Sequence, residues 1–270
     1  MDQYSNGQTH SIWDCFAEKT DESKAWLLKV LREHGCRTLL DAACGPGKES
    51  NMLIDEGFLV VSSDASEEMV ACTKALRDSK QRKHPFTWDV EKANWMTLAK
   101  DLKKPGDGFD AVICLGNAIP HLPNSQGDFS EFKLALQNLY LMVKPGGIVI
   151  CDHRNFDSIL KTGKTELSTE YTNRLTQRLE QSIIYEKGVA KTIILDYIIN
   201  NEDTKEMKSE RTFSVSLSPV LLDEFNELTS EVFGESAAHT VYGDFRPHIL
   251  GQTNDPVVFL HIIQRAVSQP

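Results

Sequence analysis

Two glycines interrupt an apolar run in the first quarter of the chain, and this interruption restricts the fold more than any other feature. The run begins at Thr38, carries an acid at Asp41, bends at Gly45 and Gly47, and continues into helix-forming residues 48–56. The pattern predicts a buried parallel strand that turns into a helix. Glycines let the backbone approach a ligand, and a helix N-terminus offers N–H groups to an anion. The loop is therefore a candidate cofactor site.

A second apolar strand, expected over Gly57–Asp64, also ends in an acid. The interval matches the one at which doubly wound nucleotide-binding folds place a ribose-binding carboxylate. The dinucleotide fingerprint has a third glycine, which lets helix and strand pack closely, and this chain has Ser50 at that position. A nicotinamide cofactor is therefore disfavoured but kept as an alternative. S-adenosylmethionine, with a ribose diol and no pyrophosphate, fits better. Asp64 is the candidate for the ribose, whereas Asp41 either orients the loop or reaches the cofactor's amino group through water.

Composition excludes several function classes. The 270 residues, 40% of them hydrophobic, can bury one good core. A net charge of −10 and a pI of about 5.3 argue against a nucleic-acid partner. The six cysteines form no C-x-x-C pair, which favours reduced core thiols over disulfides or a metal site. No apolar run is long enough to span a bilayer, so we expect a cytoplasmic protein without a membrane partner.

Strands and helices are expected to alternate through the first 155 residues. Further strands are predicted over Phe86–Val90, Gly108–Asn117 and Ile148–Cys151. Helices are predicted over Thr20–Glu33, Lys48–Glu56, Ala65–Lys80 and Phe132–Val143. This order predicts an α/β fold with a mostly parallel, doubly wound, Rossmann-like sheet and right-handed crossovers.

The second half has a different character from about Phe156 onward. Alternating β-branched residues over Leu179–Asn200 and Glu210–Leu217 predict a small antiparallel elaboration. A helix over Pro219–Phe233 and an antiparallel final strand over Pro256–Gln264 are expected to close the sheet. We expect one domain, with an N-terminal arm or lid (1–20), a cofactor-binding core (21–155), the elaboration (156–218) and a closing helix with strands (219–270).

Polar and aromatic residues follow the predicted strands, where ligands of such sheets gather. Asn94 and Trp95 could bind an adenine ring, although a buried structural tryptophan is equally compatible. Asn117 and His121 follow the fourth strand, and His121 is either a site residue or a satisfied core histidine. Arg154 follows the fifth strand as either a carboxylate clamp or an ordinary ion-pair partner.

Several of these stretches together resemble the glycine N-methyltransferase family of class I methyltransferases. The stretches are Asp41-Ala-Ala-Cys-Gly-Pro-Gly, Val61-Ser-Ser-Asp-Ala-Ser, Glu91-Lys-Ala-Asn-Trp, Gly108-Phe-Asp-Ala-Val-Ile-Cys-Leu-Gly-Asn, Pro145-Gly-Gly and Asp152-His-Arg-Asn. The resemblance runs from Tyr4 to the final strand and is strongest between residues 24 and 157. It implies a methyltransferase that uses S-adenosylmethionine, needs no metal, and converts glycine to sarcosine.

The resemblance also implies individual roles. The cofactor site would comprise Tyr4, Trp13, Lys19, Ala43, Gly45, Asp64, Asn94, Trp95, Leu115 and His121. Gly116 and Asn117 would orient the amine, Arg154 would bind the carboxylate, and Tyr4, Tyr171 and Tyr197 would surround the transferring methyl group. A homo-oligomer, by resemblance a tetramer, and a possible folate ligand are implied as well.

Four positions depart from the family's pattern. Phe16 and Leu217 replace tyrosines, Ser214 replaces an arginine near the substrate, and Lys19 replaces an arginine at the cofactor's carboxylate. They leave open a divergent paralogue that methylates sarcosine or another amine. From other classes, a nicotinamide-dependent oxidoreductase and an inactive module that binds S-adenosylmethionine or folate remain as alternatives.

Overall fold

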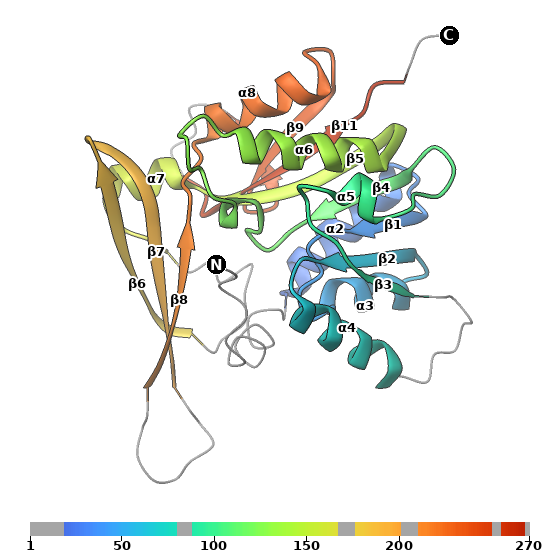
Figure 1. Ribbon diagram of the computed structural model, residues 1–270, viewed down its shortest axis with the longest axis horizontal. Coiled ribbons are helices and arrows are strands. Elements are labelled where there is room, and N and C mark those ends of the chain that lie inside the picture. Colours follow the sequence, from blue (N-terminus) through green and yellow to red (C-terminus); the bar gives the residue numbers. More distant parts are fainter. Residues whose placement is uncertain (1–18, 80–87, 167–175, 201–209, 250–254, 268–270) are drawn as a thin grey trace.

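The computed structural model describes residues 19–79, 88–166, 176–200, 210–249 and 255–267. Its described strands form an eight-stranded mixed sheet and a three-stranded antiparallel sheet that stands beside it (Figure 1). The large sheet has the order β10-β9-β11-β5-β4-β1-β2-β3. Its strands are β1 (Thr38–Asp41), β2 (Leu59–Asp64), β3 (Asp89–Lys92), β4 (Phe109–Cys114), β5 (Val143–Arg154), β9 (His239–Gly243), β10 (Arg246–Pro247) and β11 (Val258–Gln264).

The strand order confirms the predicted doubly wound fold. Strands β3, β2, β1, β4 and β5 run parallel, and β11 pairs antiparallel with β5. Connections from β1 lead outward through β2 to β3, whereas β4 and β5 extend the sheet on the other side of β1. The loops after β1 and β4 therefore flank the point where the strand order reverses, which is where ligands bind in such sheets.

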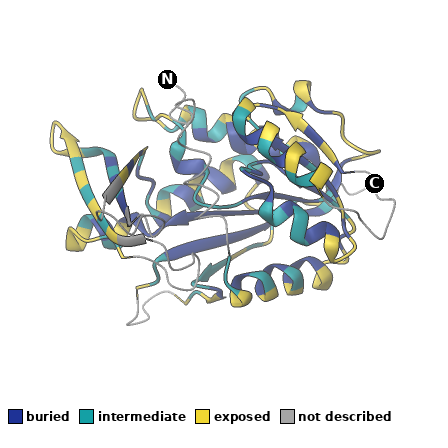
Figure 2. Ribbon diagram, turned by 90° about the horizontal axis from the view of Figure 1, so that it is seen from below, coloured by how far each residue is buried: buried dark blue, intermediate teal, exposed yellow. Residues whose placement is uncertain are grey.

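Helices cover both faces of the large sheet. They are α2 (Asp21–Glu33), α3 (Lys48–Asp55), α4 (Glu67–Ser79), α5 (Leu98–Asp101), η1 (Ile119–His121), α6 (Ser130–Met142), α7 (Phe156–Thr162) and α8 (Leu222–Phe233). One apolar core packs α2, α3 and α4 against the sheet, and a second core packs α5, α6 and α8 against the opposite face. Burial on both faces explains the uninterrupted apolar run of β4, and Figure 2 shows the central strands buried and the outer helix surfaces exposed.

The small sheet consists of β6 (Thr176–Glu186), β7 (Val189–Asn200) and β8 (Glu210–Leu217). Its inward side chains, including Leu195 and Val215, join the core beneath α6 and α8. Where β8 ends, the Ser218 N–H donates to the Pro120 carbonyl at 2.8 Å, which ties the sheet to η1. The small sheet is thereby fixed beside the loop that follows β4.

Two expected elements differ from those observed. The stretch Leu179–Asn200, predicted as one strand, forms a hairpin of β6 and β7. Lys187 and Gly188 between them both adopt positive φ, as a tight two-residue turn requires. The fifth strand, predicted over Ile148–Cys151, extends from Val143 to Arg154. Its first residues are held in the strand because the Gly146 N–H donates to the Arg265 carbonyl and the Arg265 N–H donates to the Gly147 carbonyl.

Further differences are smaller. The third strand begins at Asp89; residues 86 and 87 of its predicted start lie outside the described residues. Short elements that the sequence pattern did not indicate are α5, α7, β9 and β10. In the described part of the chain, no helix has the length and apolar character needed to cross a membrane.

Asp110, at the start of β4, joins three segments at the edge of the sheet that lies opposite the glycine loop. Its Oδ2 accepts from the backbone N–H groups of Arg37 and Thr38, each at 2.8 Å, and its Oδ1 pairs with Lys144. Although desolvation opposes the charged form, these bonds outweigh it and lower the pKa of Asp110 to about 2. The carboxylate therefore stabilises the fold above its unfolded pKa of about 4, and this contribution disappears as pH falls toward about 2.

We expect Asp110→Ala to lower the free energy of unfolding at pH 7 by about 1–3 kcal/mol, because backbone donors lose a charged acceptor. Urea titrations at neutral and acid pH measure the effect, which should shrink as the pH approaches about 3. Asp107→Ala, which removes an exposed carboxylate without a hydrogen bond among the described residues, is the control. Equal effects of the two substitutions would contradict this role of Asp110.

Candidate functional site

The glycine loop (residues 42–47) connects β1 to α3 and is held by the end of β2. The Gly45 N–H donates to Asp64 Oδ2 at 3.0 Å, and the Ser66 N–H donates to Asp64 Oδ1 at 2.8 Å. The Cys44 N–H donates to the Ser63 carbonyl at 3.0 Å. Asp64 therefore shapes the loop, and because each carboxylate oxygen has two lone pairs, it can also accept from a ligand hydroxyl.

Thr73, on α4, braces the same loop from the other side. Its hydroxyl donates to the Gly45 carbonyl at 2.8 Å. Gly47 has φ +84°, and a Cβ there would lie 2.8 Å from Thr73 Cγ2. Glycine is thus required at position 47 both by the backbone conformation and by the close approach of α4. Thr73 was not among the predicted site residues, because its only signal in the sequence is that of a polar residue within a predicted amphipathic helix.

Asp41 lies beneath the loop and is only 3% exposed. Its Oδ2 accepts from the Ser50 hydroxyl at 2.5 Å, and its Oδ1 accepts from the Ala43 N–H at 3.4 Å. Desolvation by burial raises the pKa of Asp41 to about 7, against the opposing effect of the Ser50 hydrogen bond. Of the two alternatives for Asp41, these contacts support the one in which it orients the loop.

The loop that follows β4 is held by a carboxylate from the neighbouring strand. Buried Asp152, on β5, accepts from the Gly116 N–H at 3.2 Å and from the Asn117 N–H at 2.9 Å. Asn117 has φ +59°, and its Oδ1 accepts from the Arg154 backbone N–H at 2.9 Å. One hydrogen-bonded turn therefore connects Gly116, Asn117 and Arg154, the residues predicted to bind the substrate.

The Arg154 side chain is a buried cation, 9% exposed. Its Nη2 donates to the Tyr197 hydroxyl at 3.0 Å, and its Nη1 donates to the Glu166 carbonyl at 3.2 Å. Its buried Nε has no hydrogen-bond partner, and no carboxylate pairs with the guanidinium, among the described residues. Because an uncompensated buried charge is costly, the arrangement is suited to an anionic ligand.

The remaining predicted cofactor residues lie at neighbouring strand ends. Trp95, after β3, donates from Nε1 to the Ala42 carbonyl at 2.7 Å, so its ring is fixed beside the glycine loop. The Asn94 Oδ1 accepts from the Met96 N–H at 2.9 Å and closes a turn. His121 lies in η1, where desolvation lowers its pKa to about 4 and keeps the imidazole neutral near pH 7.

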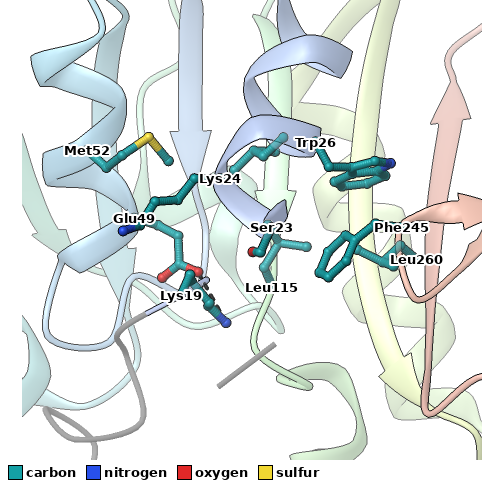
Figure 3. A pocket seen from close by; sticks show the side chains of 10 residues that line it. Lys19, Ser23, Lys24, Trp26, Glu49, Met52, Leu115, Phe245 and Leu260 are labelled. Atoms are coloured by element: carbon teal, nitrogen blue, oxygen red, sulfur yellow. Dashed lines mark ion pairs between the residues drawn. The ribbon is translucent and has the colours of Figure 1, made fainter. Parts of the chain in front are cut away.

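A pocket opens where α2 and α3 begin, beside Leu115 at the end of β4 (Figure 3). Lys19 and Glu49 both line it, and they form an ion pair of 3.2 Å. Trp26 and Phe245 contribute its apolar wall. Lys19 was expected at the cofactor's carboxylate; here its ammonium group is paired with the first turn of α3.

The other residues singled out from the sequence either lie outside the described part of the chain or belong to the small sheet. Tyr4, Trp13, Phe16 and Tyr171 lie outside the described residues. Ser214 is exposed, and its hydroxyl donates to Asp196 on the adjacent strand. Leu217 is 1% exposed and belongs to the core. The described residues contain no cluster of three or more His, Cys, Asp or Glu side chains that could hold a metal ion.

Comparisons with known proteins identify the family and the fold. A family model described as a methyltransferase domain matches residues 39–147. The chain is 41% identical to the glycine N-methyltransferase of Rattus norvegicus, over 98% of this chain and 93% of that protein. It is 30% identical to a glycine/sarcosine N-methyltransferase of Aphanothece halophytica, over 93% of this chain and 88% of that protein. A solved S-adenosylmethionine-dependent methyltransferase from Clostridium acetobutylicum, 12% identical, superposes with a TM-score of 0.66 over 92% of this chain and 93% of that one, which supports the fold.

We expect Thr73→Val to weaken binding of the candidate cofactor S-adenosylmethionine about three- to tenfold, because the Gly45 carbonyl loses a buried donor of about 0.5–1.5 kcal/mol. Isothermal titration calorimetry measures the change. Thr229→Val is the matched control, since that buried hydroxyl donates to the Asn226 carbonyl within α8. Unchanged affinity in Thr73→Val would show that the loop keeps its shape without this brace.

Proposed function

We propose that this chain, which belongs to the glycine N-methyltransferase family, transfers a methyl group from S-adenosylmethionine to the amine of glycine or a closely related small amino acid. The observation that carries the proposal is the buried guanidinium of Arg154, which has no carboxylate partner among the described residues. An amino acid supplies the missing carboxylate, and a planar guanidinium recognises a carboxylate through two parallel hydrogen bonds.

The residues around the glycine loop fit S-adenosylmethionine, which when bound supplies a methyl group on a positively charged sulfur. Gly45 and Ala43 allow close approach of a ligand to the backbone before α3, and Asp64 has acceptor capacity for a ribose diol. Trp95 offers a ring face for adenine, and Asn94 borders it. Leu115 and His121 would complete the site.

The amine would be oriented by Asn117 and Gly116. The Asn117 Oδ1 already accepts one hydrogen bond, and its second lone pair can accept from the substrate. Methyl transfer requires a neutral amine aligned with the methyl group, so alignment is the protein's main contribution. His121, with a pKa of about 4, is a weak base, and the amine's proton would pass to solvent before alignment.

The contact of Tyr197 with Arg154 supports the predicted ring of tyrosines, because the Tyr197 hydroxyl accepts a hydrogen bond from the proposed carboxylate clamp. Tyrosine oxygens and ring faces can stabilise a methyl group that carries partial positive charge. The roles of Tyr4 and Tyr171, the oligomeric state and the folate ligand remain predictions.

The decisive experiment measures S-adenosylhomocysteine release with purified protein, S-adenosylmethionine and a panel of amines. We expect release with glycine; a clear preference for sarcosine or another amine would identify the divergent paralogue. Cofactor binding without release from any amine would mean an inactive module. Binding of NAD with none of S-adenosylmethionine would overturn the proposal.

Arg154→Ala should raise the KM for the amino acid about tenfold to a hundredfold, the scale of lost hydrogen bonds to a charged group. Cofactor affinity should change little, because the clamp lies at the end of β5 and the cofactor loop follows β1. Steady-state kinetics and calorimetry measure the two quantities.

Arg154→Lys tests the geometry separately from the charge. A lysine keeps the positive charge and loses the planar fork, so a partial defect in KM is expected. If both variants had the wild-type KM, the substrate's carboxylate would have to be bound elsewhere.

A further inference from the structure

A continuous chain of buried hydrogen bonds runs beneath the glycine loop. The Trp88 Nε1–H donates to Ser62 Oγ at 2.7 Å, Ser62 donates to Ser50 Oγ at 2.6 Å, and Ser50 donates to Asp41 Oδ2 at 2.5 Å. All four side chains are buried. Trp88 precedes β3, Ser62 lies on β2, Ser50 on α3 and Asp41 on β1. The hydrogen bonds therefore run from the start of β3 past β2 to β1, which are neighbours in the sheet (Figure 1).

The direction of these hydrogen bonds is set by the two ends of the chain. An indole N–H can only donate, and an ionised carboxylate can only accept. Ser62 and Ser50 each receive one hydrogen bond and give one, so every buried polar atom in the chain is satisfied. If Asp41 were protonated and donated to Ser50, the serines would have to reverse, and one buried hydroxyl hydrogen would lose its acceptor.

The surroundings of Asp41 otherwise disfavour its charge. Glu49 on α3 and Asp64 on β2 are the nearby acids, and both raise its pKa, as burial does more strongly. Burial also raises the pKa values of the neighbouring Cys44 and Cys114 thiols, which stay neutral. Lys19 forms an ion pair with Glu49, one of these two acids. The hydrogen bond from Ser50 therefore has a large share in keeping the carboxylate available as an acceptor.

Asp41 connects this chain to the cofactor loop. One oxygen accepts from Ser50 in the first turn of α3, and the other accepts from the Ala43 N–H at the start of the loop. We propose that Ser50, Ser62 and Trp88 are positioning residues that keep Asp41 a hydrogen-bond acceptor and thereby hold the glycine loop in its cofactor-binding shape. The inference rests on the proposed function, since it concerns the same cofactor site.

The alternative is that these side chains only fill space. Ser63 provides a matched control, because it is the next residue on β2 and is equally buried, yet its hydroxyl has no hydrogen-bond partner among the described residues. Ser62→Ala and Ser63→Ala remove the same atom from neighbouring positions. Trp88→Phe keeps an aromatic ring and removes the donor that begins the chain.

The experiment measures the Kd of S-adenosylhomocysteine, a chemically stable probe, between about pH 6 and pH 9. In the wild type, affinity should be highest above about pH 8 and fall as Asp41 takes up a proton near its pKa of about 7. In Ser62→Ala and Trp88→Phe, loss of the aligned donors destabilises the carboxylate, so the midpoint should move to higher pH. Near pH 7 their Kd should be about three- to tenfold weaker, with recovery to within about twofold at about pH 9.

Ser50→Ala, which removes the direct donor to Asp41, should show the largest shift of the midpoint, and Ser63→Ala should follow the wild type. A pH-independent loss of affinity in Ser62→Ala and Trp88→Phe, or no loss, would overturn the inference. Absence of binding to the wild type at every pH would instead contradict the proposed function.

A second measurement does not depend on ligand binding. Carboxyl-carbon NMR of the ligand-free protein, assigned with Asp41→Asn, gives the titration midpoint of Asp41 directly. The midpoint should rise in Ser62→Ala and in Trp88→Phe relative to Ser63→Ala. Equal midpoints would overturn the inference even if one of the variants binds the probe poorly.

Discussion

Buried or half-buried carboxylates that accept hydrogen bonds from backbone N–H groups hold the carboxyl edge of the large sheet together. Asp64, at the end of β2, binds the loop that follows β1, and Asp152, near the end of β5, binds the loop that follows β4. Asp41 binds its own loop and the first turn of α3. Two of the three carboxylates thus fix a loop that belongs to a neighbouring strand, and the two loops at the reversal of strand order become rigid parts of the sheet.

This arrangement separates two kinds of charge along one edge. On the β1 and β2 side, acids face backbone donors and the predicted ribose position, whereas Arg154 on β5 is a buried cation without an anion among the described residues. Parallel neighbours β1, β4 and β5 bring the two regions together. Sheet order therefore places the proposed site for the cationic donor beside the proposed site for the amino acid's carboxylate, and their relative position follows from strand pairing more than from flexible side chains.

The sequence predicted the parallel core well because its signals are local: apolar runs, two glycines and an acid that ends a strand. The hairpin turn was missed because Lys187 is not a residue that favours positive φ, and its conformation depends on the pairing of β6 with β7. Ser50 was interpreted only as a departure from a dinucleotide fingerprint. Its role as a donor to Asp41 depends on Ser62 and Trp88, 12 and 38 positions farther along the chain, and no local pattern reports such a contact.

The departures from the family's pattern do not all affect the same part of the molecule. Leu217 packs in the core, where the hydroxyl of a tyrosine would need a buried partner and an apolar side chain needs none. Ser214 lies between inward-facing Phe213 and Val215, and its hydroxyl bonds to Asp196, whose neighbour Tyr197 contacts Arg154. Alternation along a strand sends Ser214 to the face opposite Tyr197. Leu217 and Ser214 therefore belong to the core and to the outer face of the small sheet, and neither takes part in the hydrogen bond between Arg154 and Tyr197.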